Sequence, residues 1–228
     1  MVPRPRSGVP VSDRFTDTLW REAEPVWQAI RQHPFLVELR AGALPIETFR
    51  YYVTQDYHYL EAFGRAVATA LAKAPTSELL TTVARRVNTP IERPLHERLF
   101  ALAGIDHQQA ASASIAPTNL AYQNHMLAVA ARGTLGETAA ALLPCPWTYH
   151  ALGDVVVDVE HPVYSVWAGF YSEGLLAESC RAWRELVDGE AAEAGPRTLI
   201  AMRRVFHLSM RYEWMFWQMA HTREEWPL

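Results

Sequence analysis

Apolar residues recur at steps of three and four along nearly the whole chain, and strand-like alternation is scarce. Such steps match the turn of an α-helix, which has about 3.6 residues, so each stretch presents one apolar face to a core. Proline and glycine fall between these stretches, where helices begin and end. The sequence therefore predicts an all-α protein, a single-domain helical bundle.

The expected helices are roughly residues 12–33, 45–74, 77–104 with breaks, 117–132, 135–143, 146–160, 162–187 and 196–222. Ser12 is the expected N-cap of the first helix. A missing amide hydrogen costs nothing in the first turn of a helix, which suits five prolines: Pro45, Pro117, Pro146, Pro162 and Pro196. Pro90 and Pro94 are expected to kink or break the segment 77–104. Residues 155–157 are valines with strand propensity, but we expect helix there because no partner strand is near.

The chain has 228 residues, half of them hydrophobic, which is enough to bury one large core. We expect a flexible lead over residues 1–11 and a single domain over residues 12–228. The lead has arginines and prolines but lacks the apolar stretch of a signal peptide. No run of about eighteen apolar residues is present, so no membrane-spanning helix is expected. These features favour a cytoplasmic protein with no membrane partner.

The charge pattern excludes several classes of function. The net charge is −4 and basic residues are scattered among acidic ones, so the sequence has no footprint for binding nucleic acid. Lys73 is the only lysine, which argues against Schiff-base chemistry and against a P-loop. Cys145 and Cys180 lack the close spacing of a disulfide framework or zinc site, which fits a reducing compartment.

Cys145 is the first candidate for chemistry. It lies between Pro144 and Pro146 and ahead of Trp147 and Tyr149. A thiol held on a stiff turn beside aromatic rings is placed to attack a flat, electrophilic ligand, provided that its surroundings favour the thiolate. The alternative is an inert core residue, because free cysteine is among the most buried residue types.

Two carboxylates interrupt apolar helical stripes. Asp56 falls on the line Phe49, Tyr52, Asp56, Tyr59, Phe63, and Glu213 falls on the line Phe206, Met210, Glu213, Trp217, Ala220. Burying an ionisable group is costly unless it is hydrogen-bonded, paired or functional. Each acid alone has a plain interpretation, which is to satisfy a neighbouring tyrosine, histidine or arginine in the core.

The two acids, the thiol and several tyrosines together predict a cavity for a heteroaromatic ring. Tyrosines can stack on such a ring, and carboxylates can fix its amino group and ring nitrogens by charge-assisted hydrogen bonds. The expected walls are Tyr59, Tyr122, Tyr149 and Tyr171. Taken singly, each tyrosine has core packing as its alternative role.

These residues occur within segments that resemble the TenA, or thiaminase II (aminopyrimidine aminohydrolase), family. The matching segments, in the order and spacing of the family, are FRYYVTQDYHYL (residues 49–60), LLPCPW (142–147), HPVY (161–164) with Trp167 and Tyr171, and YEWMFWQMA (212–220). The resemblance covers nearly the whole chain and places it in the branch that keeps the cysteine. It implies a haem-oxygenase-like fold without haem, a homotetramer, and hydrolysis of aminopyrimidines in thiamin salvage.

The resemblance also implies roles for individual residues. Cys145 would be the nucleophile that adds to the pyrimidine ring, and Glu213 the acid and base that protonates the leaving group and helps to activate water. Asp56 would anchor the amino and ring nitrogens, while Tyr59, Tyr122, Tyr149 and Tyr171 stack on or hydrogen-bond the substrate. No metal or organic cofactor is required. The substrate is 4-amino-5-aminomethyl-2-methylpyrimidine, its formyl derivative or thiamin, and the sequence does not distinguish these leaving groups.

Two other functions stay open at this point. The first is a di-iron oxidase, since Glu92 and His96 are four apart and His150, Asp154, Asp158 and His161 lie near one another. Pro94 between Glu92 and His96 counts against it. The second is a non-enzymatic interaction or regulatory protein with a structural Cys145, although no segment resembles a helix-turn-helix with a basic face.

Overall fold

The computed structural model describes residues 14–78, 81 and 93–227 of the chain. These residues form helices and contain no strand, which confirms the predicted all-α class. The helices are α1 (Phe15–Arg31), α2 (Pro34–Arg40), α3 (Ile46–Leu71), α5 (Arg93–Ala103), α6 (His107–Ser112), α7 (Pro117–Arg132), α8 (Leu135–Leu142), α9 (Pro144–Leu152), α10 (Tyr164–Ser172), α11 (Ala177–Glu193) and α12 (Pro196–Thr222).

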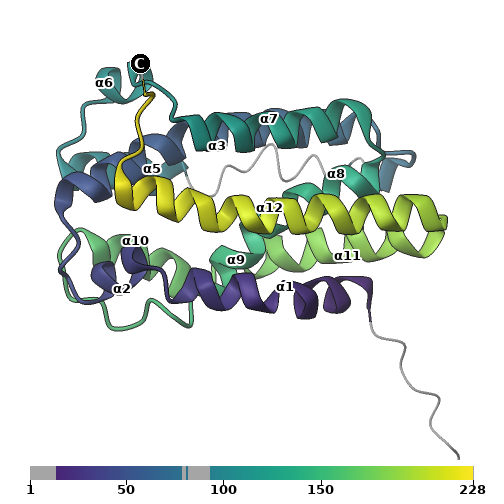
Figure 1. Ribbon diagram of the computed structural model, residues 1–228, viewed down its shortest axis with the longest axis horizontal. Coiled ribbons are helices and arrows are strands. Elements are labelled where there is room, and N and C mark those ends of the chain that lie inside the picture. Colours follow the sequence, from purple (N-terminus) through teal and green to yellow (C-terminus); the bar gives the residue numbers. More distant parts are fainter. Residues whose placement is uncertain (1–13, 79–80, 82–92, 228) are drawn as a thin grey trace, which may run out of the picture.

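Helix α12 is the central element of the bundle. It runs through the middle of Figure 1 and contacts α1, α2, α3, α7, α8 and α9. Its inward stripe is buried as the periodicity predicts: Phe206, Met210, Glu213, Trp217 and Ala220 are all 5% exposed or less. Helix α3 lies beside α7 and turns its own aromatic stripe toward the same core. The two carboxylates thus come from two helices that face one interior.

The predicted helix boundaries agree best with the structure for the two helices that begin at a proline and were expected as single helices. Helices α7 and α12 begin and end where expected. The short helices α2 and α6 were not predicted. The predicted helix 162–187 is wrong, because the chain forms α10 and α11 with a break at residues 173–176. Gly174 in this break has a φ of +72°, a conformation that glycine adopts without steric cost.

The prediction of one helix over residues 146–160 is also wrong. Helix α9 begins at Pro144 and ends at Leu152. A Cβ at the following residue, Gly153, would lie 2.6 Å from the backbone oxygen of Tyr171, so glycine permits α10 to approach α9 closely. The amides of Val155 and Val156 both donate to the carbonyl of Leu152, so this segment is a turn.

The prolines take several positions at helix starts. Pro117 and Pro196 are the first residues of their helices, as expected. Pro45 is instead the N-cap of α3, and Pro162 precedes α10. Pro94 is the second residue of α5. The chain just before α5, where the expected kink or break would lie, is outside the described residues. The expectations for Ser12, Pro90 and the residues around them lie outside the described residues.

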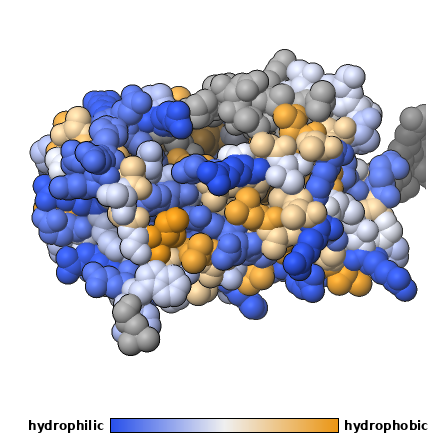
Figure 2. Space-filling model, turned by 90° about the horizontal axis from the view of Figure 1, so that it is seen from above, coloured by the Kyte–Doolittle hydropathy of each residue, from blue (hydrophilic) through white to orange (hydrophobic). Residues whose placement is uncertain are grey.

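The outer surface carries intermixed charged and apolar side chains. The face in Figure 2 is mostly hydrophilic, with apolar patches separated by polar side chains. Within the described ranges, no helix combines the length and the apolar composition needed to cross a bilayer. Buried acids and aromatic rings meet in the interior.

Candidate functional site

Cys145 lies in the first turn of α9 and not on a turn ahead of a helix, which corrects the sequence-based expectation. Pro144 is the first residue of the helix, and a proline fits there because it needs no amide partner. The side chain is 7% exposed. Trp147 stacks on Trp20 of α1 at 4.4 Å between ring centroids, and the Arg184 guanidinium lies 4.4 Å from the same indole. These contacts hold α9, and with it the thiol, against its neighbours.

Glu213 lies on the buried face of α12 and is 3% exposed. The hydroxyl of Tyr122 donates to its Oε1 at 2.6 Å, and Thr148 Oγ1 lies 3.3 Å from its Oε2. Both oxygens of the carboxylate thus have donors from other helices, α7 and α9. Because a charged carboxylate is an acceptor only, this arrangement favours the ionised form.

Tyr59 and Tyr122 join Cys145 and Glu213 in one cluster. The two rings lie 5.1 Å apart between centroids. Burial raises the pKa of Tyr59, and the nearby ionisable thiol of Cys145 raises it further. Burial also raises the pKa of Tyr122, followed by the effects of Glu213 and Cys145. Both phenols therefore stay protonated and act as hydrogen-bond donors beside the thiol and the carboxylate.

Asp56 also points inward, and its partner is a histidine from α5. The Nε2 atom of His96 lies 2.8 Å from Oδ2 of Asp56, and both residues are less than 10% exposed. In the sequence, His96 was a candidate only for an iron ligand. The signal that would have found it is the one used for Asp56, since His96 shares a buried stripe with Leu99, Phe100 and Ala103 of α5.

Tyr149 interacts electrostatically with both acids. Its pKa is raised by burial, and then by Tyr52, Asp56, Tyr171 and Glu213. Its hydroxyl is 2.9 Å from the hydroxyl of Tyr52, which also accepts a hydrogen bond from Nε1 of Trp167 at 3.2 Å. Its ring lies 4.9 Å from that of Tyr171. Tyr149 is therefore the tyrosine on which both acids act.

All seven residues predicted for the site are buried in this interior region: Cys145, Glu213, Asp56, Tyr59, Tyr122, Tyr149 and Tyr171. Sequence reasoning missed His96 as the partner of Asp56, Tyr52 as the partner of Tyr149, and Thr148 as a neighbour of Glu213. Whether the seven residues act on a substrate stays a prediction.

The geometry weighs against the di-iron interpretation. Because α9 ends at Leu152, His150, Asp154, Asp158 and His161 do not share one helical face. Nδ1 of His161 accepts hydrogen bonds from the amides of Val163 and Tyr164. His96 pairs with Asp56, while Glu92 lies outside the described residues. Among the residues that the structure places, no three histidine, cysteine or acidic side chains converge as a metal site.

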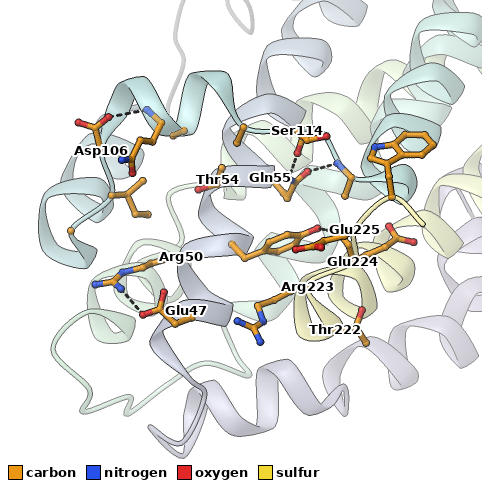
Figure 3. A pocket seen from close by; sticks show the side chains of 18 residues that line it. Glu47, Arg50, Thr54, Gln55, Asp106, Ser114, Thr222, Arg223, Glu224 and Glu225 are labelled. Carbon is orange, nitrogen blue, oxygen red and sulfur yellow. Dashed lines mark hydrogen bonds and ion pairs between the residues drawn. The ribbon is translucent and has the colours of Figure 1, made fainter. Parts of the chain in front are cut away.

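A separate pocket of about 920 Å³ opens between α3, residues 104–116 and residues 222–226 (Figure 3). Tyr51 and Gln55 of α3 line it, and Asp56 does not. Two of its polar side chains bond the backbone of neighbouring segments: Tyr51 donates to the carbonyl of Glu224, and Gln55 donates to that of Ser114. None of the seven predicted site residues lines this pocket. We therefore place the candidate site at the buried cluster.

The family model described as TENA/THI-4/PQQC matches residues 20–223. The chain belongs to this family. An aminopyrimidine aminohydrolase of Bacillus subtilis is 30% identical over 93% of this chain and 92% of its own length. A second aminopyrimidine aminohydrolase, from Halalkalibacterium halodurans, is 29% identical over 93% of this chain and 97% of its own length. This membership confirms the resemblance found in the sequence.

Solved structures agree with this assignment. A TenA homologue from P. horikoshii superposes with a TM-score of 0.81 at 30% identity, over 92% of this chain and 99% of that one. A protein with a haem-oxygenase-like fold from Shewanella denitrificans has a TM-score of 0.74 at 14% identity, over 93% of this chain and 94% of that one, and so shares the fold alone. The predicted haem-oxygenase-like architecture of the TENA/THI-4/PQQC family is thus confirmed.

Proposed function

We propose that this chain is an aminopyrimidine aminohydrolase that replaces the amine of 4-amino-5-aminomethyl-2-methylpyrimidine with a hydroxyl group, with thiamin as a second candidate substrate, in thiamin salvage. The observation that carries the proposal is the buried cluster of one thiol and two carboxylates among tyrosines. Aminopyrimidine aminohydrolases among the relatives support the reaction class. Tyr59, Tyr122, Tyr149 and Tyr171 surround the ring, and Asp56, held by His96, bonds its amino group and a ring nitrogen.

The proposed reaction begins when Glu213 accepts the thiol proton of Cys145. The sulfur then forms a bond to the ring carbon beside the one that carries the aminomethyl group, and the displaced electron pair moves to a ring nitrogen. The pair returns to expel the amine, to which Glu213 gives the proton, and an exocyclic methylene remains. Covalent addition divides one difficult displacement into easier steps.

Water completes the cycle in the reverse sense. Hydroxide adds to the methylene while the second proton of the water passes to Glu213. The carbon–sulfur bond breaks, aromaticity is restored, and Cys145 regains a proton from Glu213. The net change is amine plus water to alcohol plus ammonia, and Glu213 ends charged, as its two hydrogen-bond donors favour.

The test is turnover of the aminomethyl pyrimidine and of thiamin by the purified protein, with release of the hydroxymethyl pyrimidine as readout. Cys145→Ala should abolish turnover, whereas Cys180→Ala is the matched control. Cys180 is also buried, and its thiol pKa is raised to about 11, chiefly by burial, so it is a poor nucleophile. Equal activity of wild type and Cys145→Ala would remove the thiol from the mechanism. A folded wild type that converts neither compound would refute the activity and favour a regulatory role.

The resemblance also leads us to propose a homotetramer that works in the cytoplasm. Cys145 and Cys180, both within the described residues, are not joined in a disulfide, which is compatible with a reducing compartment. Light scattering on the purified protein measures the oligomeric state, and a monomer would contradict this part of the proposal.

A further inference from the structure

Thr148 occupies an unusual place between the candidate nucleophile and the candidate acid. It is fully buried, with 0% of its surface exposed, and lies three residues after Cys145 in α9. Its Oγ1 atom is 3.2 Å from the backbone oxygen of Cys145 and 3.3 Å from Oε2 of Glu213. A hydroxyl has one hydrogen and two lone pairs, so Thr148 donates to one of these oxygens at a time.

The two possible acceptors correspond to two states of Glu213. When the carboxylate is charged it only accepts, and the Thr148 hydrogen points to Oε2. When Glu213 is protonated at Oε2 it becomes a donor, and the Thr148 oxygen accepts while its own hydrogen turns to the Cys145 carbonyl. Both arrangements use atoms already within hydrogen-bond distance, so neither requires a backbone movement.

We propose that Thr148 is a positioning residue that gives Glu213 a hydrogen-bond partner in both of its protonation states. This inference rests on the proposed function, in which Glu213 takes up and releases a proton twice in each cycle. Thr148 would stabilise the charged acid before the reaction and the protonated acid during it, while it holds Oε2 in place next to α9.

Protonation of Glu213 can be recognised in a pH profile only if the titratable groups around it are known. Tyr59 from α3, Tyr122 from α7 and Tyr149 from α9 interact with it electrostatically, and Cys145 of α9 acts on Tyr59 and Tyr122. His125 of α7 bonds Ser209, which precedes Glu213 by one turn of α12. The three phenols have pKa values raised by burial, so they stay neutral at neutral and acidic pH. The contact of α12 with α8 involves uncharged groups here, because the Ser209 hydroxyl of α12 donates to the backbone carbonyl of Ala141 in α8.

Other charged partners of α12 are engaged elsewhere along the helix. Glu22 of α1 bonds His207, and Glu38 of α2 bonds His221. Asp56 of α3 acts on Tyr149 and is paired with His96. Burial lowers the pKa of His125, but His125 is unaltered in every Thr148 variant, so a change in the acidic limb that depends on the Thr148 hydroxyl reports on Glu213.

The experiment compares kcat/KM for the aminomethyl pyrimidine across pH in wild type, Thr148→Val and Thr148→Ser. Valine matches the shape of threonine without the hydroxyl, and serine keeps the hydroxyl. Loss of a donor to the charged carboxylate makes its protonation easier, and hydrogen bonds to charged groups are the strong ones. We expect the acidic limb of Thr148→Val to move to higher pH, with about a tenfold lower kcat/KM on that limb. Thr148→Ser should keep the wild-type profile.

Three results would overturn the inference. They are an unchanged pH profile in Thr148→Val, the same change of profile in Thr148→Val and Thr148→Ser, and a loss of kcat/KM in Thr148→Val that is equal at all pH values. Should Thr148→Val fail to fold, Thr148→Ala and Thr148→Ser form a second matched pair that differs by one hydroxyl, and equal profiles in this pair would again be contrary. An inactive wild type defeats the proposed function itself, whereas an active wild type with an unaltered Thr148→Val defeats only the role of Thr148.

Discussion

The phenol of Tyr122 donates a 2.6 Å hydrogen bond to Glu213 across the interface of α7 and α12, and both residues are 3% exposed or less. Buried hydrogen bonds to a charged acceptor are short and strong, and they fix the orientation of the acceptor. The bond therefore sets where the second oxygen of Glu213 points, which is toward α9 and Thr148. This hydrogen bond therefore keeps the carboxylate in one orientation, which a general acid and base needs for proton transfer.

We expect Tyr122→Phe to lower kcat by about tenfold to a hundredfold, because the hydrogen bond to a charged group contributes roughly 1.5–3 kcal/mol. Tyr212→Phe is the matched control, since it removes the same hydroxyl group from the ring that stacks on Tyr122 at 5.0 Å. Steady-state kinetics of both variants provide the measurement. Equal losses in the two variants would assign the effect to ring packing.

Glu213→Gln should separate chemistry from binding. Glutamine keeps the shape and a carbonyl that accepts from Tyr122, but it takes up no proton in this pH range. We expect kcat to fall by at least about a hundredfold, in the range measured for general acid and base groups. Affinity for the hydroxymethyl product, measured by calorimetric titration, should change by less than about tenfold. A similar loss in both quantities would make Glu213 a binding group.

The inward direction of Asp56 and Glu213 was predictable because an acid on an apolar helical stripe has a local signature. Their partners were not, since His96 comes from another helix and pairing across helices leaves no trace in the spacing along either one. The end of α9 was missed for a similar reason. The sequence around Gly153 does not show that a side chain there would collide with the backbone oxygen of Tyr171, because Tyr171 belongs to another helix, α10.

The short helices α2 and α6 are too brief for a clear apolar period. Each begins with a side chain that caps a backbone amide: Nδ1 of His33 accepts from Phe35, and Asp106 accepts from Gln109. Capping by Asp106 was readable in principle, because aspartate is a common N-cap. Capping by His33 was not, because a histidine in that role depends on the tautomer that its surroundings select.

The buried Asp56–His96 pair should contribute to stability as well as to binding. Removing His96 leaves the buried carboxylate of Asp56 without this hydrogen-bond donor, at a cost of about 1–3 kcal/mol. We expect His96→Leu to lower the free energy of unfolding by an amount in that range, and His96→Gln to cost clearly less because its amide can donate to Asp56. Denaturant titrations of the two variants make the comparison. Equal destabilisation would mean that ring packing of His96 on Phe100, and not its bond to Asp56, is what matters.

Two histidines with lowered pKa values, the buried His33 and the partly buried His125, predict how stability depends on pH. Burial lowers the pKa of His33 from its ordinary 6.5, with a smaller opposing effect of the Gln218 hydrogen bond, and burial likewise lowers the pKa of His125. The unfolded chain therefore binds protons at a higher pH than the folded chain. Above the ordinary pKa of 6.5 neither state is protonated and the effect is absent. Stability falls as the pH drops through that value toward the lowered one.

His33→Asn isolates this effect, because asparagine is a good N-cap that can accept from the Phe35 amide but does not titrate. We expect the free energy of unfolding of wild type to decrease between about pH 7.5 and 5.5, and that of His33→Asn to decrease less steeply. A second substitution, His125→Asn, should flatten the dependence further. Chemical denaturation at several pH values measures the slopes. A steeper slope in His33→Asn than in wild type would show that the folded protein stabilises the protonated imidazole, the opposite of what the burial of His33 at the N-cap of α2 implies.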